Sequence, residues 1–212
     1  MLAKTEQDVL LDLEKMLEIE IPLRIEEPTY EECLFYMVTA DGRHISHIRI
    51  RGKNLKHLPR SIGDLTHLEE LDLYENDLRT LPESFGNLTN LCSLVLANNC
   101  FETLPQSFEK LTRLETLHLD CNKIRSLPEV FNGLVNLTDF TISQNELISL
   151  PKSIKRLSNL RNLDISANYL STLPEMENLS LLTFLDVSKN ELISLPTSFK
   201  QLTNMEDYTV FR

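Results

Sequence analysis

Hydrophobic residues recur at a fixed spacing along the chain from Ile45 onward. The repeating unit reads L-x-x-L-x-L-x-x-N-x-L-x-x-L-P-x-x-φ-x-x-L-x-x, where φ is a large apolar residue and the length is about 23 residues. One copy begins at Leu68, and later copies begin at Leu91, Leu114, Leu137, Leu160 and Leu182. A period of this length predicts a solenoid in which each repeat is one supersecondary unit stacked on the next.

Each L-x-L step of the unit predicts a short strand, because side chains along a strand alternate between its two faces. The leucines face inward, and the residues between them face the concave side of the solenoid. Successive strands then form one parallel sheet. A single repeat leaves its leucines exposed, so apolar burial worth roughly 25 cal/mol per Å² is obtained only when repeats stack.

Two further columns complete the unit. An asparagine follows each strand and is expected to hydrogen-bond the turning backbone, forming a buried ladder and not a binding site. Each Leu-Pro pair predicts a short helix or 3-10 turn on the convex side, since proline is tolerated in a first helical turn. The asparagine column comprises Asn76, Asn99, Asn122, Asn145, Asn168 and Asn190. The large residues that anchor the convex turns are Phe85, Phe108, Phe131, Ile154 and Phe199.

Residues 1–44 do not follow the repeat and are predicted to cap the first repeat, whose leucines would otherwise face water. Thr5 and Asp8 resemble a capping box at the start of a helix, and Pro22 is expected to end that helix. One face of the helix is apolar and comprises Val9, Leu10, Leu13, Met16 and Leu17. A second interpretation is that the acidic helix docks a partner by itself.

A strand hairpin is expected between this helix and the repeats. Residues 33–39 are rich in aromatic and β-branched side chains, Asp41-Gly42 is a turn signal, and residues 44–50 form the return strand. Seven repeats then span residues 45–204, and residues 205–212 either begin an eighth repeat or form a C-terminal cap. The apolar pattern of that last segment is carried by Met205, Tyr208 and Val210.

The formal net charge of −11 bears on the choice of partner. It argues against nucleic acid and against anionic membranes, both of which attract basic surfaces. A protein partner with a basic patch suits an acidic surface better, and a contribution to solubility alone is the other explanation of the charge. The oligomeric state is left open.

The four cysteines form no C-x-x-C pair, and no cysteine-rich cap flanks the repeats. The N-terminus has no basic region followed by an apolar core, so no signal peptide is expected, and no stretch approaches the roughly 18 apolar residues of a membrane span. These features favour a reduced, cytoplasmic location. No nucleotide-binding or nucleophile motif occurs, so neither a cofactor nor catalysis is expected. His118, Asp120 and Cys121 lack the spacing of a metal site, so no metal is expected either.

The unit L-P-x-x-φ-x-x-L-x-x-L-x-x-L-x-L-x-x-N-x-L resembles the 23-residue Leu-Pro class of leucine-rich repeats. That class is found in Ras-binding scaffolds, Scribble-type polarity proteins, Roco GTPases and prokaryotic repeat proteins. The resemblance covers roughly residues 45–210. It implies an α/β solenoid: a leucine-rich repeat horseshoe with a parallel concave sheet, short convex helices or 3-10 turns, and an N-terminal helix-hairpin cap. The class binds many partners through one scaffold, so the likeness specifies the fold more closely than the function.

The residues between the strand leucines are the candidate partner-binding residues. At the N-terminal end, basic and acidic groups either bind a partner or pair with each other across neighbouring strands. Farther along, small and apolar residues give way to carboxylates, and Tyr74 and Phe184 are candidate anchors. The candidate set is Arg49, Arg51, Glu70, Asp72, Tyr74, Val95, His118, Asp120, Thr141, Asp164, Phe184 and Asp186.

These observations favour a non-catalytic protein–protein interaction module that binds its partner mainly through the concave face. The specific hypothesis is that a basic segment of the partner lies against the stretch Asp139–Asp164–Asp186. A flank, an edge or the cap is the alternative site. The alternative function is recognition within a larger signalling enzyme, such as a GTPase, kinase or ubiquitin ligase, whose catalytic part is not in this chain.

Overall fold

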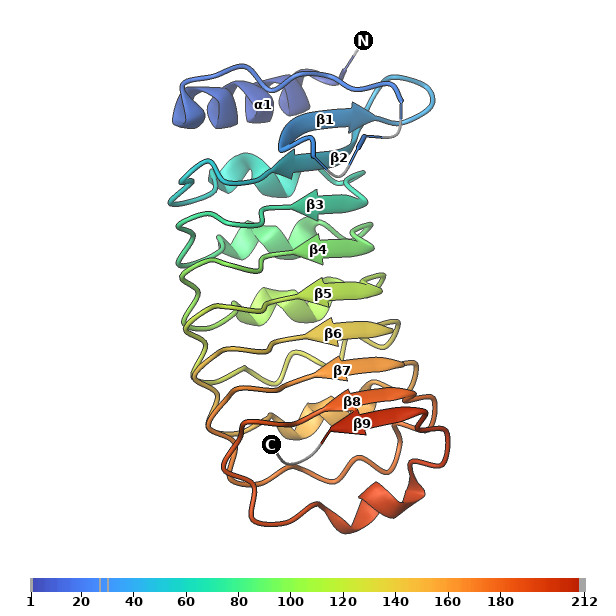
Figure 1. Cartoon of the computed structure of the whole chain (residues 1–212). Helices are drawn as coiled ribbons and strands as arrows, with labels where there is room; N and C mark the ends of the chain where they lie inside the picture. The colour runs from blue at the N-terminus through green and yellow to red at the C-terminus, as the bar shows by residue number, and fades with distance from the viewer. Residues whose placement is uncertain (1, 27, 30, 210–212) are drawn as a thin grey trace.

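The computed structural model describes residues 2–26, 28–29 and 31–209 of the chain. In these residues it contains one α-helix, a nine-stranded sheet and five short 3-10 helices. The strands lie in sequence order from β1 to β9, and Figure 1 shows them as a ladder with helix α1 at the N-terminal end and β9 at the other. The predicted solenoid is confirmed.

Strands β1 and β2 form an antiparallel hairpin, and from β2 to β9 every neighbouring pair is parallel. The register advances by one repeat per rung, so that Ile48 lies opposite Leu71 and Leu71 lies opposite Leu94. Alternation within each L-x-L step thus gives the predicted strands. Their bounds are β1 Leu34–Val38, β2 Ile45–Ile50, β3 Glu70–Asp72, β4 Ser93–Val95, β5 Thr116–His118, β6 Asp139–Thr141, β7 Asn162–Asp164, β8 Phe184–Asp186 and β9 Asp207–Thr209.

Behind the sheet, the convex side carries 3-10 helices that each begin directly after the proline of a Leu-Pro pair. They are η1 Arg60–Asp64, η2 Glu83–Asn87, η3 Gln106–Lys110, η4 Lys152–Arg156 and η5 Thr197–Gln201. In the described residues, Pro128 and Pro174 are the two prolines of Leu-Pro pairs that are not directly followed by a 3-10 helix. Between the two layers the rings of Phe85 and Phe108 stack with centroids 5.6 Å apart. These two residues and Phe131 are completely buried, whereas Phe199 near the C-terminal end is half-buried.

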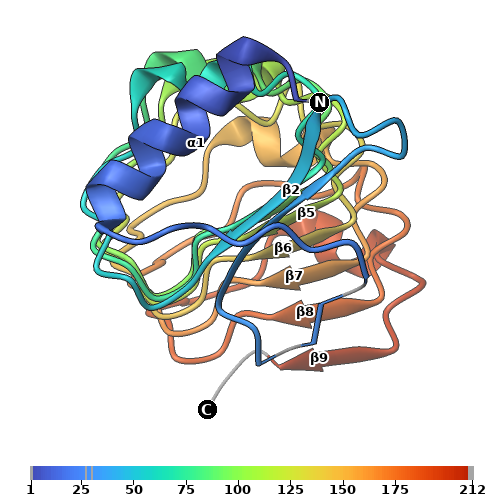
Figure 2. The same ribbon diagram turned by 90° about the horizontal axis from the view of Figure 1, so that it is seen from above.

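Helix α1, Lys4–Leu17, covers the first repeat, and Val9 and Leu13 are completely buried. Seen from above in Figure 2, the helix lies over the convex side of the stack. The hydroxyl of Ser61 in η1 donates to a carboxylate oxygen of Asp12 at 3.2 Å. This packing is what a cap over the first repeat requires.

The ends of α1 differ from the sequence-based expectation. Ala3 is the N-cap and no side chain caps the helix, so the predicted Thr5–Asp8 capping box is wrong. The helix ends at Leu17 because Glu18 adopts the left-handed conformation, with φ of 57°, four residues before Pro22. Met16 is 38% exposed and lies outside the buried face.

At the other end, β9 pairs in parallel with β8 and places Tyr208 opposite Leu185. Tyr208 therefore takes the position of a strand leucine, as the apolar pattern predicts, but it is 58% exposed. Its ring packs edge-on against Phe199, with centroids 5.8 Å apart. Val210, the last residue of that pattern, lies outside the described residues.

Candidate functional site

The concave face presents three aligned columns of side chains, because equivalent residues of successive repeats pair in register. The first column is His47, Glu70, Ser93, Thr116, Asp139, Asn162 and Phe184. The second is Arg49, Asp72, Val95, His118, Thr141, Asp164 and Asp186. The third follows the strands and is Arg51, Tyr74, Ala97, Asp120, Ser143, Ser166 and Ser188. Every candidate residue lies in one of these columns.

At the N-terminal end, Arg49, Arg51 and Asp72 form a charge cluster. Arg51 Nε donates to Asp72 Oδ2 at 2.7 Å, and Arg49 Nε lies 3.3 Å from the same oxygen. The three side chains are only 13–18% exposed. On the same rungs His47 lies 3.6 Å from Glu70. The basic and acidic groups therefore pair across neighbouring strands.

The charge cluster also attaches the segment that joins α1 to β1. Arg49 Nη1 donates to the backbone carbonyls of Thr29 at 3.1 Å and Glu32 at 3.3 Å, and its guanidinium lies 4.8 Å from the centroid of the Phe35 ring. Figure 2 shows this segment passing over the concave side of the uppermost rungs. Together they bound a hollow of about 280 Å³ whose lining includes Met37 and Val95. The segment has no hydrophobic period, so nothing in the sequence predicted this overhang.

From β5 to β8 the concave face carries Asp120, Asp139, Asp164 and Asp186, here called the acidic strip. Asp120 accepts hydrogen bonds from the backbone N–H and the hydroxyl of Ser143, each at 2.8 Å, and from the hydroxyl of Thr141. These bonds join neighbouring rungs and hold the Asp120 carboxylate in place.

The other carboxylates of the acidic strip also accept hydrogen bonds, either from a neighbouring rung or from their own repeat. Asp139 lies 3.5 Å from His118 Nε2 and accepts a hydrogen bond from Asn162 at 3.0 Å. Asp164 and Asp186 each accept the backbone N–H of the serine two residues later, at 2.9 and 2.8 Å. All four carboxylates are thus positioned by local hydrogen bonds.

The charges of the acidic strip are close enough to affect one another. Burial raises the pKa of Asp164, and the carboxylates of Asp186 and Asp120 raise this pKa further, against the opposing effect of the hydrogen bonds from Ser166. The pKa of His118 is raised mainly by its hydrogen bond to Asp139. Among the described residues the strip forms an ion pair with His118 and none with a lysine or arginine. It is therefore a concentration of negative charge that no lysine or arginine of the described residues neutralises.

Two sets of residues on the concave face are less exposed than the strand pattern suggests. Ala97 and Ser143, in the third column, are each only 8% exposed. The proposed anchors Tyr74 and Phe184 are half-buried, and the Arg51 guanidinium lies 6.0 Å from the centroid of the Tyr74 ring. Close stacking of the rungs shields these positions, which a strand pattern alone does not show.

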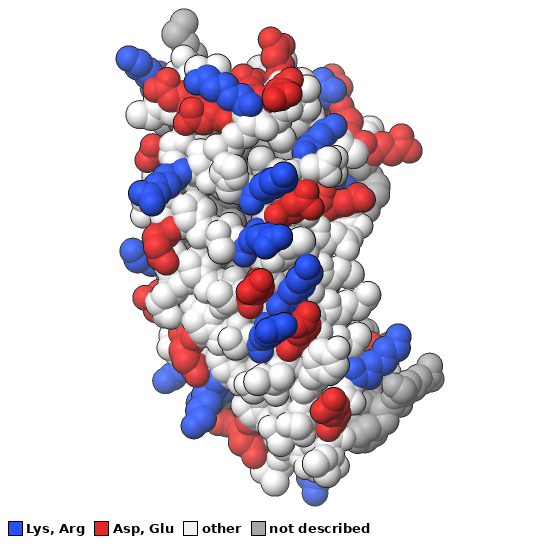
Figure 3. Space-filling model, turned by 90° about the vertical axis from the view of Figure 1, so that its left-hand side faces the viewer, with Lys and Arg blue, Asp and Glu red and all other residues white. Residues whose placement is uncertain are grey.

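The flank beyond the ends of the strands differs from the acidic strip. Figure 3 shows lysines and arginines interspersed with aspartates and glutamates along most of this face. One such pair is Arg125 and Glu146, 2.9 Å apart on neighbouring repeats. Farther toward the C-terminus this flank exposes Ile148, Tyr169 and Ile193. Charge of a single sign is thus a property of the concave strip and not of this flank.

In the described part of the chain, His118, Asp120 and Cys121 do not form a group of three potential metal ligands. Such a group is formed by Glu6, His44 and His67.

No described helix has the length and apolar character needed to cross a membrane.

Comparisons with known proteins agree with this architecture. A family model for a leucine-rich repeat region matches residues 39–144. A leucine-rich repeat protein of Leptospira interrogans has 35% identity and a TM-score of 0.72, over 76% of this chain and 41% of that protein. The search of curated proteins found no match.

Two complexes resemble the chain at lower identity. The plant peptide hormone receptor RGFR1 with RGF2 has 24% identity and a TM-score of 0.61, over 79% of this chain and 32% of that one. The Toll–Spatzle complex of Drosophila has 24% identity and a TM-score of 0.62, over 76% and 26%. These two likenesses show the fold alone. The chain spans less than half the length of each of the three structures.

Proposed function

This chain belongs to the leucine-rich repeat proteins, and on that premise we propose that it is a non-catalytic protein-interaction module. Its acidic strip binds a basic segment of a protein partner. The observation that carries this proposal is the placement of Asp120, Asp139, Asp164 and Asp186, one on each of four consecutive rungs of the concave face, without a lysine or arginine ion pair in the described residues. RGFR1 and Toll, which share the fold, are seen in complexes with RGF2 and Spatzle.

The electrostatic argument rests on Asp164. Its raised pKa means that the negative charge is less favourable there than on a free carboxylate, because of burial and the neighbouring carboxylates. The positive charge of a bound lysine or arginine offsets the repulsion from the neighbouring carboxylates, and its charge-assisted hydrogen bonds compensate for the burial of Asp164. His118, Thr141 and Phe184 border the strip and are the contacts that we expect to add specificity.

The spacing of the rungs suggests how the basic segment is arranged. Neighbouring strands lie about 4.8 Å apart, so two rungs span about 9.6 Å. Three residues of a polyproline II chain span about 9.3 Å and bring the side chain back to the same face. A polyproline II segment running along the solenoid with basic residues at every third position therefore reaches carboxylates two rungs apart. The pairs Asp120–Asp164 and Asp139–Asp186 have this separation, and each pair is offset by one column along the strands.

In this proposal the candidate residues at the N-terminal end of the concave face mainly support the structure and do not form the centre of the binding site. Arg49, Arg51 and Asp72 hold the overhanging segment, and Glu70 and Tyr74 lie beside them and extend the surface. A cytoplasmic location also belongs to the proposal, supported by four cysteines that are all free.

The test is selection from a random peptide library displayed on phage, carried out in parallel against immobilised wild type and an Asp164→Lys, Asp186→Lys variant. Wild type is expected to enrich sequences with several lysines or arginines. The selected peptides should bind the variant at least about tenfold more weakly, since close charge pairs at an interface are commonly worth more than 1 kcal/mol. Their affinity for wild type should fall as salt is raised.

A Glu83→Lys, Glu109→Lys variant is the control, because it changes the net charge equally on the convex helices η2 and η3. It should bind the selected peptides nearly as wild type does. Enrichment of peptides without basic residues, or equal binding by all three proteins, would count against the acidic strip as the site.

A further inference from the structure

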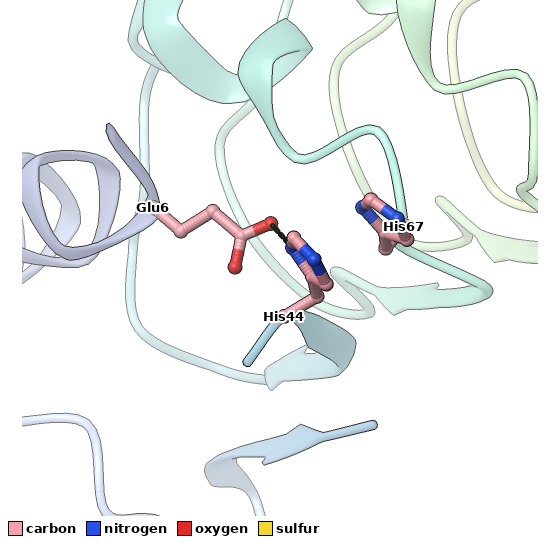
Figure 4. Close-up of side chains that lie close together, drawn as sticks. All are labelled: Glu6, His44 and His67. Atoms are coloured by element: carbon pink, nitrogen blue, oxygen red, sulfur yellow. Dashed lines mark hydrogen bonds and ion pairs between the residues drawn. The ribbon is translucent and has the colours of Figure 1, made fainter. Parts of the chain in front are cut away.

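Three side chains with metal-binding groups meet where the cap joins the first repeat, away from the acidic strip. Glu6 comes from α1, His44 lies just before β2, and His67 lies between η1 and β3. One carboxylate oxygen and one ring nitrogen from each histidine all lie within 4.8 Å of one another. Figure 4 shows the Glu6 carboxylate directed at His44, with His67 on the far side of the His44 ring.

The repeat period places the two histidines together. Positions 44 and 67 are one repeat apart, so they are equivalent positions on adjacent rungs. The two imidazole rings stack with centroids 3.6 Å apart and an interplanar angle of 14°. The next two positions of this column are Asn90 and Arg113, so the histidine pair occurs only where the cap joins the first repeat.

Glu6 supplies a buried negative charge at the same point. Its side chain is 3% exposed; Oε2 accepts the backbone N–H of Ile45 at 2.8 Å, and Oε1 lies 3.2 Å from His44 Nδ1. No lysine or arginine among the described residues forms an ion pair with it. Its ion-pair partner among the described residues is His44, which is positive only when it is protonated, and a buried carboxylate is costly without a positive partner. The site therefore favours a bound cation.

We propose that Glu6, His44 and His67 bind a divalent transition-metal ion, with zinc as the best fit, and that the ion fastens the cap to the first repeat. Two imidazoles and one carboxylate, with a water in the fourth position, are a donor set that zinc accepts. Magnesium and calcium prefer oxygen ligands throughout, so two nitrogen donors select against them. The ligands come from the helix, the hairpin and the first repeat, which an ion at this point joins.

Binding requires one rearrangement. Stacked rings do not direct their nitrogens at one centre, and zinc bonds of about 2.0–2.1 Å in tetrahedral geometry place ligand atoms about 3.3 Å apart. His67 is exposed and can turn its ring about χ1 and χ2. Glu6 is held by Ile45 and is the fixed side of the site.

The test is isothermal titration of the full chain, without an affinity tag, with zinc chloride at about pH 7.5. Wild type is expected to bind one equivalent and to melt at a higher temperature with zinc than without it. His67→Ala should bind about tenfold or more weakly and lose the zinc-dependent rise in melting temperature. His57→Ala removes another exposed histidine and should behave as wild type, and magnesium chloride should give no binding.

Glu6→Gln keeps the size of the side chain and removes its charge, so it tests the carboxylate separately and should also weaken zinc binding. Binding should decline between about pH 7.5 and 5.5, because protons compete for the imidazoles. The proposal is overturned if wild type does not bind zinc. It is equally overturned if His67→Ala and Glu6→Gln bind zinc with wild-type affinity and stoichiometry, since the ion then lies on the cysteines or on other histidines.

Discussion

At the scale of single residues, the asparagine column shows how one side chain joins neighbouring repeats. Asn122 Nδ2 donates to the carbonyls of Leu96 and Leu119, at 3.0 and 2.9 Å, and Asn122 Oδ1 accepts the N–H of Phe101 at 3.0 Å. The side chain is only 8% exposed, so these backbone groups have little access to water. Each asparagine thus satisfies backbone groups of its own repeat and of the preceding one.

Replacing Asn122 by leucine should therefore destabilise the protein. The change leaves buried backbone groups without partners, which costs about 1–3 kcal/mol for each group. For a chain of this size we expect the melting temperature to fall by several degrees, measured by circular dichroism. Asn132→Leu, at an exposed position, is the control and should change it little. Equal melting curves for the two variants would refute a structural role for the column.

The raised pKa of His118 makes a second prediction at this scale. The hydrogen bond to Asp139 favours the protonated imidazole in the folded state. Its contribution to stability is therefore present below about pH 6.5, the value for a free histidine, and is lost as the pH rises through the raised folded-state pKa. His118→Gln should lose more stability at about pH 5.5 than at about pH 8.5 in urea unfolding. A loss that is the same at both pH values would contradict this assignment.

At the scale of elements, the convex helices stack closely because small residues separate them. A Cβ added at Gly86 in η2 would lie 2.6 Å from the carbonyl oxygen of Ser107 and 2.7 Å from its Cβ. Both atoms belong to η3, and one of them is backbone, so the two helices would have to move apart.

We therefore expect Gly86→Ala to reduce the free energy of unfolding by about 1–3 kcal/mol, the usual cost of overpacking. Asn87→Ala, at the next and exposed position, should remain within about 0.5 kcal/mol of wild type. Urea unfolding of both variants measures the difference. A Gly86→Ala variant as stable as wild type would mean that η2 and η3 are free to separate.

Among the elements, those that follow a period were predictable and those at chain ends were less so. The strands are confirmed because a leucine-like apolar pattern specifies them in every repeat, and 3-10 helices directly follow five of the seven Leu-Pro pairs. The start of α1 was mispredicted, since Thr5 and Asp8 match a local capping pattern that the structure does not use. The helix also ends early, at a left-handed Glu18 whose side chain gives no such signal.

At the scale of the whole molecule, the candidate site was predictable as columns and not as contacts. The repeat places Asp120, Asp164 and Asp186 on one face from the sequence alone. It does not show that Arg49 holds Thr29 and Glu32, because that contact joins the repeats to a segment without a period. The pair of His44 and His67 was visible as a 23-residue spacing, but Glu6 reaches it only through the packing of α1.

The order of the strands also predicts which parts of the molecule unfold locally when one repeat is destabilised. Each rung contacts its neighbours, so stability is nearly a sum over repeats and their interfaces. Leu13 and Leu117 are both completely buried, one in the cap and one in β5, and either change to alanine costs about 2–5 kcal/mol. Leu13→Ala should raise amide hydrogen exchange in α1 and β2 and leave β7 and β8 protected, whereas Leu117→Ala should raise it in β4 to β6.

The comparison is made by mass spectrometry, with Leu11→Ala as the control because Leu11 lies on the exposed side of the same helix, 49% exposed. That control should exchange as wild type does. If Leu13→Ala instead raised exchange equally in every strand, the molecule would open as a single unit, and the cap would govern the stability of the whole sheet. A local response would show that the concave rungs carrying the acidic strip keep their geometry when the cap is loosened.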